Sequence, residues 1–409
     1  MQPDDRPRDW PPHERRVVPW RQTVERGPRA DRQLREIEVR LPPMIADLHH
    51  VADRPLATSM VNALGNLAQL DDSHGRRLRA LNQLLLRTES VASSKIEDVQ
   101  ASMADYGKAV LGTRANASAV SMAAATDALA GVVVEAGSGT IERESLRRAH
   151  AVLFRRSVDQ QHNAGRYRTV QNWIGGSDYT PRNALYVPPP PETVDGYLDD
   201  LFAFANRDDL PPLTQAAVVH AQFESIHPFV DGNGRIGRTL VHAVLRRRRA
   251  TRHLTVPIAS GLVAHREKYF DALADYRDGY AQPIIGMLTS ATLVATHESR
   301  RTATNLREVR EEWEERLGGV AAGSTLARVL AQLPESPTVT VQTLAETVGR
   351  PEDEVRAAVE RLLETEVLVP AGRSLPGRRT ERVLSARDIL DELADLNDRI
   401  VAVSRLGPR

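Results

Sequence analysis

Residues 225–238 have the sequence SIHPFVDGNGRIGR, and this stretch decides how the whole chain is interpreted. Apolar residues recur at helical spacing on both sides of it, which predicts a loop between helices at about 213–226 and 235–249. Gly232 and Gly234 permit positive φ angles and a close approach of the backbone to a ligand. The first N–H groups of the following helix point at the same place, where the helix dipole is positive. The loop therefore predicts a binding site for phosphate groups.

The charged side chains of the loop fit the same interpretation. Arg235 and Arg238 are three residues apart, so they share a helix face, and their planar guanidinium groups suit phosphate oxygens. Asp231 is a hard oxygen ligand of the type that Mg²⁺ prefers beside phosphates. His227 carries an imidazole that can accept a proton from a hydroxyl nucleophile, and Phe229 is expected to point into the core. A glycine-rich loop with a histidine buried for packing is the simpler alternative, but it does not account for all these residues at once.

The pattern His227-Pro-Phe-x-Asp-Gly-Asn-Gly-Arg-x-x-Arg238 resembles the signature of the Fic (Fic/DOC) family and matches it without departure. The resemblance implies an all-helical core with a β-hairpin flap. It also implies a protein adenylyltransferase, which moves AMP from ATP to a Ser, Thr or Tyr hydroxyl of a target protein, or of the enzyme itself, and releases pyrophosphate. ATP would be the co-substrate and Mg²⁺ the metal. The implied roles are a general base at His227, a metal ligand at Asp231, an anion hole at Gly232, Asn233 and Gly234, and β- and γ-phosphate contacts at Arg235 and Arg238.

Residues 93–98, SSKIED, lie on a predicted helix and resemble the inhibitory motif of the same family. That motif is Ser or Thr, three residues, Glu, and then Gly or Asn. Ser93 and Glu97 occupy its first positions and face the same way on a helix, whereas Asp98 departs from it at the last. The resemblance implies that Glu97 pairs with Arg238 and competes with the γ-phosphate of ATP for the guanidinium group. An ordinary surface Ser/Glu pair is the alternative.

Residues 165–176 have a strand-like composition and end on Gly175-Gly176, and a second short strand pattern follows at 184–187. Together they predict a β-hairpin that the prolines at 188–191 terminate. The segment resembles the Fic flap, whose exposed edge could pair with an extended target segment by strand addition. A structural hairpin in which Trp173 caps the core is the alternative. The expected target-docking residues are Thr169, Gln171, Asn172, Trp173, Ile174, Gly175 and Gly176.

The predicted fold is mainly α: an all-helical core with the short hairpin flap, plus a small C-terminal domain. Residues 1–36, rich in Arg, Asp and Pro, are expected to be a flexible arm. Residues 37–115 are predicted to form an N-terminal helical region with the inhibitory helix, and residues 116–317 the catalytic core. Residues 325–400 show a helix-turn-helix pattern around Gly349 with two short strands, which predicts a winged-helix-like domain.

The sequence leaves two features open. Tyr269 and Tyr276, on a helix after the motif, are candidates for contacts with adenine or for core packing. The winged-helix-like domain invites a DNA interpretation, but residues 350–366 hold three arginines and six acids, which would repel phosphates unless the acids point away. Recruitment of a target or support of a homodimer is favoured over DNA binding. The expected wing is more basic, with Arg373, Arg378, Arg379 and Arg382.

Three functions are compatible with these residues. The first is the adenylyltransferase restrained by Glu97. A variant keeps the fold but removes AMP from targets or transfers another nucleotide or phosphate group. The resemblance implies AMP transfer rather than kinase action, because the phosphorylating members of the Fic family depart from the Gly-Asn-Gly-Arg sequence that is complete here. The alternative from another class is a winged-helix DNA-binding regulator whose core only senses nucleotide. The complete set of catalytic residue types, His227 above all, argues against a purely sensory core.

Composition sets the remaining limits. Lys+Arg and Asp+Glu both total 54, so a globally basic nucleic-acid binder is not indicated. The absence of cysteine excludes disulfides and thiolate zinc sites. No secretory signal pattern is recognised at the N-terminus. The most apolar run, residues 117–136, is rich in Ala and interrupted by Asp127 and Glu135. We therefore expect a soluble cytoplasmic protein without a membrane partner.

Overall fold

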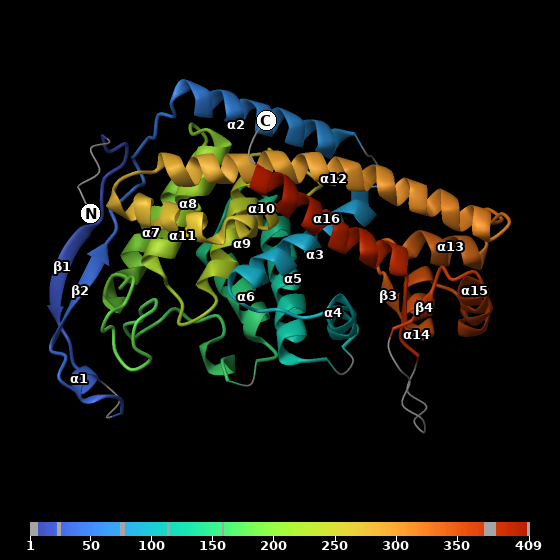
Figure 1. Cartoon of the computed structure of the whole chain (residues 1–409), viewed down its shortest axis with the longest axis horizontal. Helices are drawn as coiled ribbons and strands as arrows, with labels where there is room; N and C mark the ends of the chain where they lie inside the picture. Colours follow the sequence, from blue (N-terminus) through green and yellow to red (C-terminus); the bar gives the residue numbers. More distant parts are fainter. Residues whose placement is uncertain are drawn as a thin grey trace. The chain divides into compact units, whose positions relative to one another are not determined.

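The computed structural model describes residues 7–22, 26–73, 78–112, 115–157, 159–371 and 382–406. Helices dominate, as predicted (Figure 1). The chain divides into two compact units: unit 1 comprises residues 1–61, 127–250 and 266–289, and unit 2 comprises residues 62–126, 251–265 and 290–409. The units do not follow the linear boundaries expected from sequence, because three long helices each begin in one unit and end in the other. These are α2 (Arg54–Asp72), α5 (Ala117–Ala136) and α12 (Gln282–Arg316).

Unit 1 is built around the pair of helices α8 (Pro212–Ile226) and α9 (Asn233–Arg247). Every residue of α8 from Leu213 to Ile226 is buried, so this helix is surrounded by protein on all sides. Gly237 of α9 lets the two helices approach closely, since a Cβ there would lie 3.0 Å from the Phe223 ring. The other helical elements of the unit are α6 (Arg143–Phe154), η2 (Gln161–Asn163), η3 (Pro191–Thr193), α7 (Val194–Ala205) and α11 (Arg266–Asp278).

The N-terminal residues differ from the flexible arm expected from their composition. Strand β1 (Glu14–Pro19) pairs antiparallel with β2 (Glu36–Leu41), with the short helix α1 (Arg29–Arg32) between them. In β2, the alternate residues Ile37, Val39 and Leu41 are buried and pack with Val187. This period-2 pattern in EIEVRL is a strand signal that the charged composition of the segment obscures. Residues 1–6 and 23–25 of the expected arm lie outside the described residues.

Unit 2 contains α3 (Leu78–Ile96), α4 (Met103–Val110), α10 (Ile258–Ala264) and the C-terminal helix α16 (Arg387–Leu406). Helix α10 packs against both α3 and α16. A buried carboxylate holds it in place: Glu89 Oε2 accepts a hydrogen bond of 2.7 Å from the N–H of Ala259, in the first turn of α10.

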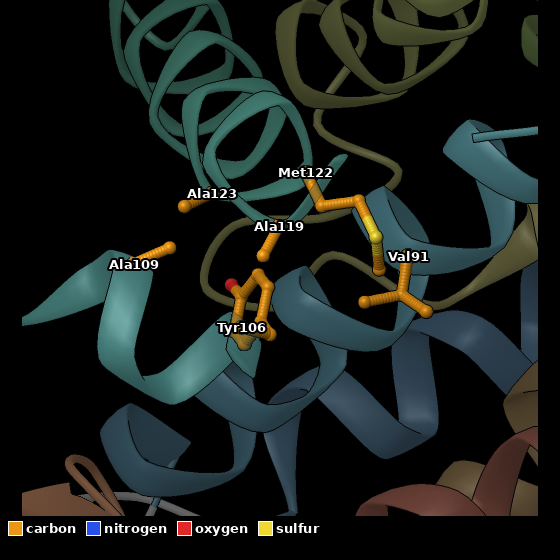
Figure 2. Close-up of a cluster of buried hydrophobic side chains, with 6 residues drawn as sticks. All are labelled: Val91, Tyr106, Ala109, Ala119, Met122 and Ala123. Atoms are coloured by element: carbon orange, nitrogen blue, oxygen red, sulfur yellow. The ribbon is translucent and has the colours of Figure 1, made fainter. Parts of the chain in front are cut away.

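A small apolar cluster joins α3, α4 and the start of α5 (Figure 2). Tyr106 of α4 lies against Ala119 of α5, and its hydroxyl is 2.9 Å from Thr126 Oγ1. Val91 of α3 and Met122 of α5 complete the contact. Ala119 and Met122 are fully buried, so the small side chains of α5 permit close helix packing here.

The C-terminal part of unit 2 has the elements that the sequence pattern predicts. Helices α13 (Thr325–Gln332), α14 (Val341–Val348) and α15 (Glu352–Glu364) pack on one another. Strands β3 (Thr338–Val339), β4 (Val369–Pro370) and β5 (Leu384–Ser385) form an antiparallel sheet in the order β3-β5-β4. Gly349 ends α14 with a φ of +64°, as expected for the turn. The predicted wing arginines Arg373, Arg378 and Arg379 lie outside the described residues.

Among the described residues, α5 alone is long and apolar enough to cross a bilayer by length and composition. Half of its most apolar window is buried within the protein. A core helix of a soluble protein has the same properties, so this helix is weak support for a membrane span.

Candidate active site

The loop between α8 and α9 is held by hydrogen bonds to its backbone. His227 ends α8 in the left-handed region, with φ +50° and ψ +58°. Arg168, only 3% exposed, donates from Nε to the His227 carbonyl at 2.9 Å, and its backbone N–H donates to Pro228 O at 2.8 Å. Asn172 Nδ2 donates to Phe229 O at 2.9 Å. The unusual backbone at His227 is therefore fixed by a separate segment of the chain.

Two buried side chains complete this support. Asn233 accepts from the Phe229 N–H at 2.9 Å and donates to the Phe229 carbonyl at 2.8 Å. The His150 ring stacks on Phe229 with centroids 3.9 Å apart. Because His150 Nδ1 accepts from the Gly165 N–H, its Nε2 carries the hydrogen and donates to the Asp231 carbonyl at 3.0 Å. Burial lowers the pKa of His150 to about 4, so the ring is neutral near pH 7.

The turn into α9 has the geometry expected for an anion cradle. Gly232 precedes the helix with φ +76°, and a Cβ there would lie 2.7 Å from the Phe154 ring, so glycine is required on both counts. The first helical bond runs from the Ile236 N–H to Gly232 O at 3.1 Å. The earlier N–H groups, such as that of Gly234, therefore face the loop at the positive end of the helix. The Asn233 side chain is occupied by Phe229, so only its backbone can contribute.

The charged residues of the motif gather at this helix end. Asp231 is about half exposed; its Oδ1 accepts a 2.5 Å hydrogen bond from the Gly232 N–H and lies 3.9 Å from Arg235 Nη2. Arg235 is 7% exposed, and its guanidinium lies 5.4 Å from the centre of the Phe154 ring. Arg238, on the next turn, is 2% exposed and lies 3.4 Å from the Tyr269 hydroxyl. The structure thus brings His227, Asp231 and both arginines together around one short loop.

The His227 ring has a neighbour that sequence reasoning did not single out. Its Nδ1 lies 3.4 Å from the Glu224 carbonyl oxygen and 3.9 Å from the Glu224 carboxylate. Glu224 is buried in the last turn of α8. Two oxygen acceptors on the Nδ1 side favour the tautomer with hydrogen on Nδ1, which leaves the Nε2 lone pair as the proton acceptor.

The residues present fit a metal ion that takes one protein carboxylate and most of its other ligands from substrate and water. No group of three or more His, Cys, Asp or Glu side chains that could hold an ion occurs within the described part of the chain. Asp231 offers one accessible carboxylate beside the anion cradle. Mg²⁺ commonly takes one or two carboxylates and completes its shell with substrate phosphates and water. The site therefore fits a Mg²⁺ ion that arrives with a nucleotide.

Comparison with known proteins identifies a known domain within this chain. Residues 140–245 match the model of the Fic/DOC family. This chain carries a Fic/DOC domain. Over 108 residues it is 32% identical to a probable protein adenylyltransferase of Aquifex aeolicus, covering 25% of this chain and 30% of that protein. Over 145 residues it is 30% identical to the protein adenylyltransferase Fic of Nematostella vectensis, covering 34% and 30%. The matches thus span less than a third of each relative's length.

A solved structure shows the same fold. A Fic family protein from Desulfovibrio desulfuricans superimposes with a TM-score of 0.52 at 21% identity, covering 83% of this chain and 98% of that one. The mainly helical Fic fold predicted from the sequence is therefore confirmed.

The flap of the Fic domain is smaller than the predicted hairpin. Only Ile174 and Tyr186 form a β-bridge, with Ile174 N–H donating to Tyr186 O at 2.9 Å. The remaining expected residues bind elsewhere: Gln171 donates to Pro188 O, Asn172 to the catalytic loop, and Trp173 to Ser177 O while its ring meets Trp20 edge-on. Prolines at 188–191 and these side-chain bonds replace a longer ladder. Thr169, Gly175 and Gly176 are exposed.

The predicted inhibitory residues belong to unit 2, whereas the loop 227–238 belongs to unit 1. Ser93 is buried in the last turns of α3, and Glu97 is the first residue after that helix, in a turn. Asp98 has φ +58°. Glycine and asparagine occur in this left-handed region more readily than other residues, and aspartate shares the property. The geometry explains how Asp98 replaces the Gly or Asn of the Fic inhibitory motif. The Glu97–Arg238 pairing stays a prediction.

The two tyrosines proposed for adenine contacts are core residues. Tyr276 is fully buried, and its hydroxyl donates to Gln222 Oε1 at 2.8 Å. Tyr269 is 1% exposed, with its hydroxyl between His220 Nε2 at 2.8 Å and Arg238. Tyr269 therefore contacts Arg238 from within the core, and Tyr276 packs in the core.

The exposed face of α15 argues against the DNA interpretation. Its acids Glu352, Asp353, Glu354, Glu360 and Glu364 are all exposed, so the surface of this helix carries negative charge. Arg356 lies on the same helix but faces Glu352 at 3.8 Å. An acidic recognition helix would repel nucleic-acid phosphates.

Proposed function

We propose that this chain is a protein adenylyltransferase that transfers AMP from ATP to a hydroxyl group of a target protein. The observation that carries the proposal is the single loop in which His227 lies beside the N-terminus of α9 with Asp231, Arg235 and Arg238. The names of the relatives support it: one is a probable protein adenylyltransferase and the other a protein adenylyltransferase Fic. The activity, its substrates and its partners are proposals for this chain.

The arrangement suggests how the reaction proceeds. His227 Nε2 accepts the proton of the target hydroxyl while the hydroxyl oxygen forms a bond to the α-phosphorus of ATP. The bond between the α-phosphorus and the bridging oxygen breaks, and pyrophosphate leaves. The N–H groups at the start of α9 and the guanidinium groups of Arg235 and Arg238 stabilise the negative charge of the phosphates throughout. A bound Mg²⁺, held by Asp231, would supply further charge neutralisation.

The flap region offers exposed apolar side chains for a target. Leu185, beside the bridge, is 85% exposed, and Val170 is 53% exposed. A peptide in extended conformation that adds to the Ile174 segment would cover such side chains, and backbone pairing would hold its hydroxyl residue in register.

We further propose that Glu97 restrains the reaction by occupying Arg238, as the resemblance of residues 93–98 to the Fic inhibitory motif implies. Removal of the carboxylate would leave the guanidinium to the γ-phosphate and would orient the α-phosphate for in-line attack. The left-handed turn at Asp98 supports the assignment of the motif.

The test compares label transfer from [α-³²P]ATP and [γ-³²P]ATP with Mg²⁺, with and without cell lysate. The variants are the parent, Glu97→Gly and Glu97→Gly combined with His227→Ala. The matched control combines Glu97→Gly with His162→Ala, because His162 is exposed in η2. We expect α-label on protein from Glu97→Gly and the control, weak label from the parent, and a loss of about 10²–10⁴-fold without His227.

Other outcomes assign other chemistry. Transfer of γ-label instead of α-label would indicate a kinase. Release of AMP from a pre-modified target, without net transfer, would indicate AMP removal. Equal α-label from the parent and Glu97→Gly would contradict the proposed restraint and leave the transferase proposal intact.

A further inference from the structure

A pocket in unit 2 has no role in the proposed reaction. It has a cavity volume of about 80 Å³ and is bordered by α3, α4, β3, α14 and α16. Most of its wall is apolar, made by Met103, Tyr106, Val339, Leu344, Leu390 and Leu393. The inner wall includes the tyrosine that also contacts α5 in the cluster of Figure 2. Pockets with apolar walls and a few converging polar groups are typical ligand sites.

One cation in this pocket is only partly satisfied. Arg87 of α3 donates from Nη2 to the Glu335 carbonyl at 2.6 Å. Its Nη1 is shielded from solvent and makes no hydrogen bond of normal geometry among the described residues. Burial lowers the pKa of Arg87, against smaller opposing effects of a weak side-chain interaction with the Tyr106 hydroxyl and of the Glu335 charge. The Glu335 carboxylate itself lies 3.2 Å from the exposed Arg79. A guanidinium stays protonated in proteins, so this nitrogen is a buried donor without a hydrogen bond.

A second polar group in the same pocket is in a similar state. Thr338 of β3 is 6% exposed, and its Oγ1 has no hydrogen-bond partner among the described residues. The helix opposite approaches it through Gly107 of α4, where a Cβ would collide with the Thr338 side chain. A buried hydroxyl and a buried guanidinium nitrogen without partners each destabilise a protein, because neither regains the hydrogen bond that it made to water. Both residues line the same pocket, so a ligand there with an acceptor group would supply the missing hydrogen bonds.

We propose that this pocket binds a small organic carboxylate, with its charged group on Arg87 and Thr338 and its hydrocarbon body against the apolar wall. Charge complementarity selects an anion over a neutral molecule of the same shape, because Nη1 would donate a charge-assisted hydrogen bond. The apolar wall selects an organic body over an inorganic ion. The bound molecule would contact α3, the helix that ends one residue before Glu97.

Isothermal titration of the full chain with benzoate tests the site, with benzyl alcohol as the neutral probe of similar shape. We expect benzoate to bind with a Kd of about 1 mM and benzyl alcohol at least tenfold more weakly. Arg87→Met should weaken benzoate binding about tenfold or more, and the isosteric Thr338→Val about threefold. Arg79→Met is the matched control, since it removes an exposed guanidinium from the same helix without touching the pocket wall, and it should bind like the parent.

Several results would overturn the proposal. One is the absence of benzoate binding up to about 20 mM, which would leave ordered water as the partner of Arg87. Another is equal binding of benzoate and benzyl alcohol, or unchanged binding by Thr338→Val and Arg87→Met together. Circular dichroism shows whether Arg87→Met is folded; the isosteric Thr338→Val variant decides the question if it is not. Binding is measured without ATP, so the result is independent of the proposed transferase activity.

Discussion

Arg168 is buried and Arg87 is partly buried, and the two arginines lie in different environments. Arg168 donates to four backbone carbonyls, those of His227, Val170, Pro189 and Ile226. Arg87 donates to one, and its Nη1 makes no hydrogen bond of normal geometry among the described residues. Burial lowers the pKa of both, that of Arg168 to about 10.

The difference separates a structural arginine from a binding one. Arg168 is stabilised by acceptors that the fold itself supplies, so it acts as a clamp on the catalytic loop. Arg87 faces an apolar pocket in which an acceptor is missing, so a ligand can supply it. Burial alone therefore does not reveal the role of an arginine; the number of its satisfied donors does.

The largest expected effect is that of Arg168→Met. Four carbonyls lose a donor, and the left-handed backbone at His227 loses its support, so we expect about 3 kcal/mol or more of destabilisation and loss of label transfer. Arg87→Met should change stability less, because it removes one backbone hydrogen bond instead of four, together with a donor that is unsatisfied. Thermal denaturation of both variants measures the contrast, with Arg166→Met as the exposed control near Arg168. Equal losses in Arg168→Met and Arg87→Met would abolish the distinction.

The second largest expected effect is a loss of stability at low pH in unit 1, the unit that contains Arg168. His13, His150 and His220, all in unit 1, have pKa values lowered by burial to about 3, 4 and 3. A histidine with an ordinary pKa near 6.5 in the unfolded chain binds more protons there than in the folded protein, so stability falls as the pH drops from about 6.5 toward 4. For His150 the loss is on the order of 3 kcal/mol.

Melting temperature against pH measures this effect. His150→Asn should flatten the profile between pH 6.5 and 4, because the titrating group that stacks on Phe229 is gone. A profile identical to that of the parent would show that the unfolding of unit 1 does not depend on His150.

A third prediction concerns the helix pair that carries the loop. In Gly237→Ala the new Cβ would lie 2.5 Å from Glu224 Oε1 and 3.0 Å from the Phe223 ring, so α8 and α9 must separate slightly. We expect a loss of about 1–3 kcal/mol. Gly196→Ala in α7 is the control: nothing lies within 4 Å of its Cβ, and alanine should stabilise the helix by about 0.5–1 kcal/mol. Chemical denaturation of the two variants should therefore give shifts of opposite sign.

The smallest expected effect concerns Thr338, which lines the same pocket as Arg87. Thr338→Val removes a buried hydroxyl that makes no hydrogen bond, so stability should rise or stay equal, within about 1 kcal/mol. A clear destabilisation in denaturant titration would mean that Thr338 Oγ1 has a hydrogen-bond partner, such as an ordered water. The polar groups of the pocket would then lack fewer hydrogen bonds than Arg87 suggests.

Local patterns were enough to predict the helices around the motif. The expected helix at 213–226 is α8, and the turn at 232–234 begins α9 as the glycines indicate. The helix-turn-helix around Gly349 is also present. These features depend on neighbours within one or two turns, which is why a single sequence specifies them.

Other features depended on residues far apart in the chain. The strand β2 was missed because its alternate apolar residues are few and its pairing with β1 is what stabilises it. The C-terminal helix α16 was not predicted, although its Ile389, Leu393, Leu396 and Ile400 recur at helical spacing and are buried. That signal was present in the sequence and could have been used.

The candidate site shows the same division. The sequence by itself determined that the candidate chemical groups lie together, because His227, Asp231, Arg235 and Arg238 occupy one short loop and the helix turn after it. Only the tertiary structure showed that Arg168, Asn172 and His150 hold the loop in place, and that Arg87 and Thr338 share a pocket. A hydrogen bond between distant segments leaves no periodic trace in a sequence, so satisfied and unsatisfied buried donors can be told apart only once the chain is folded.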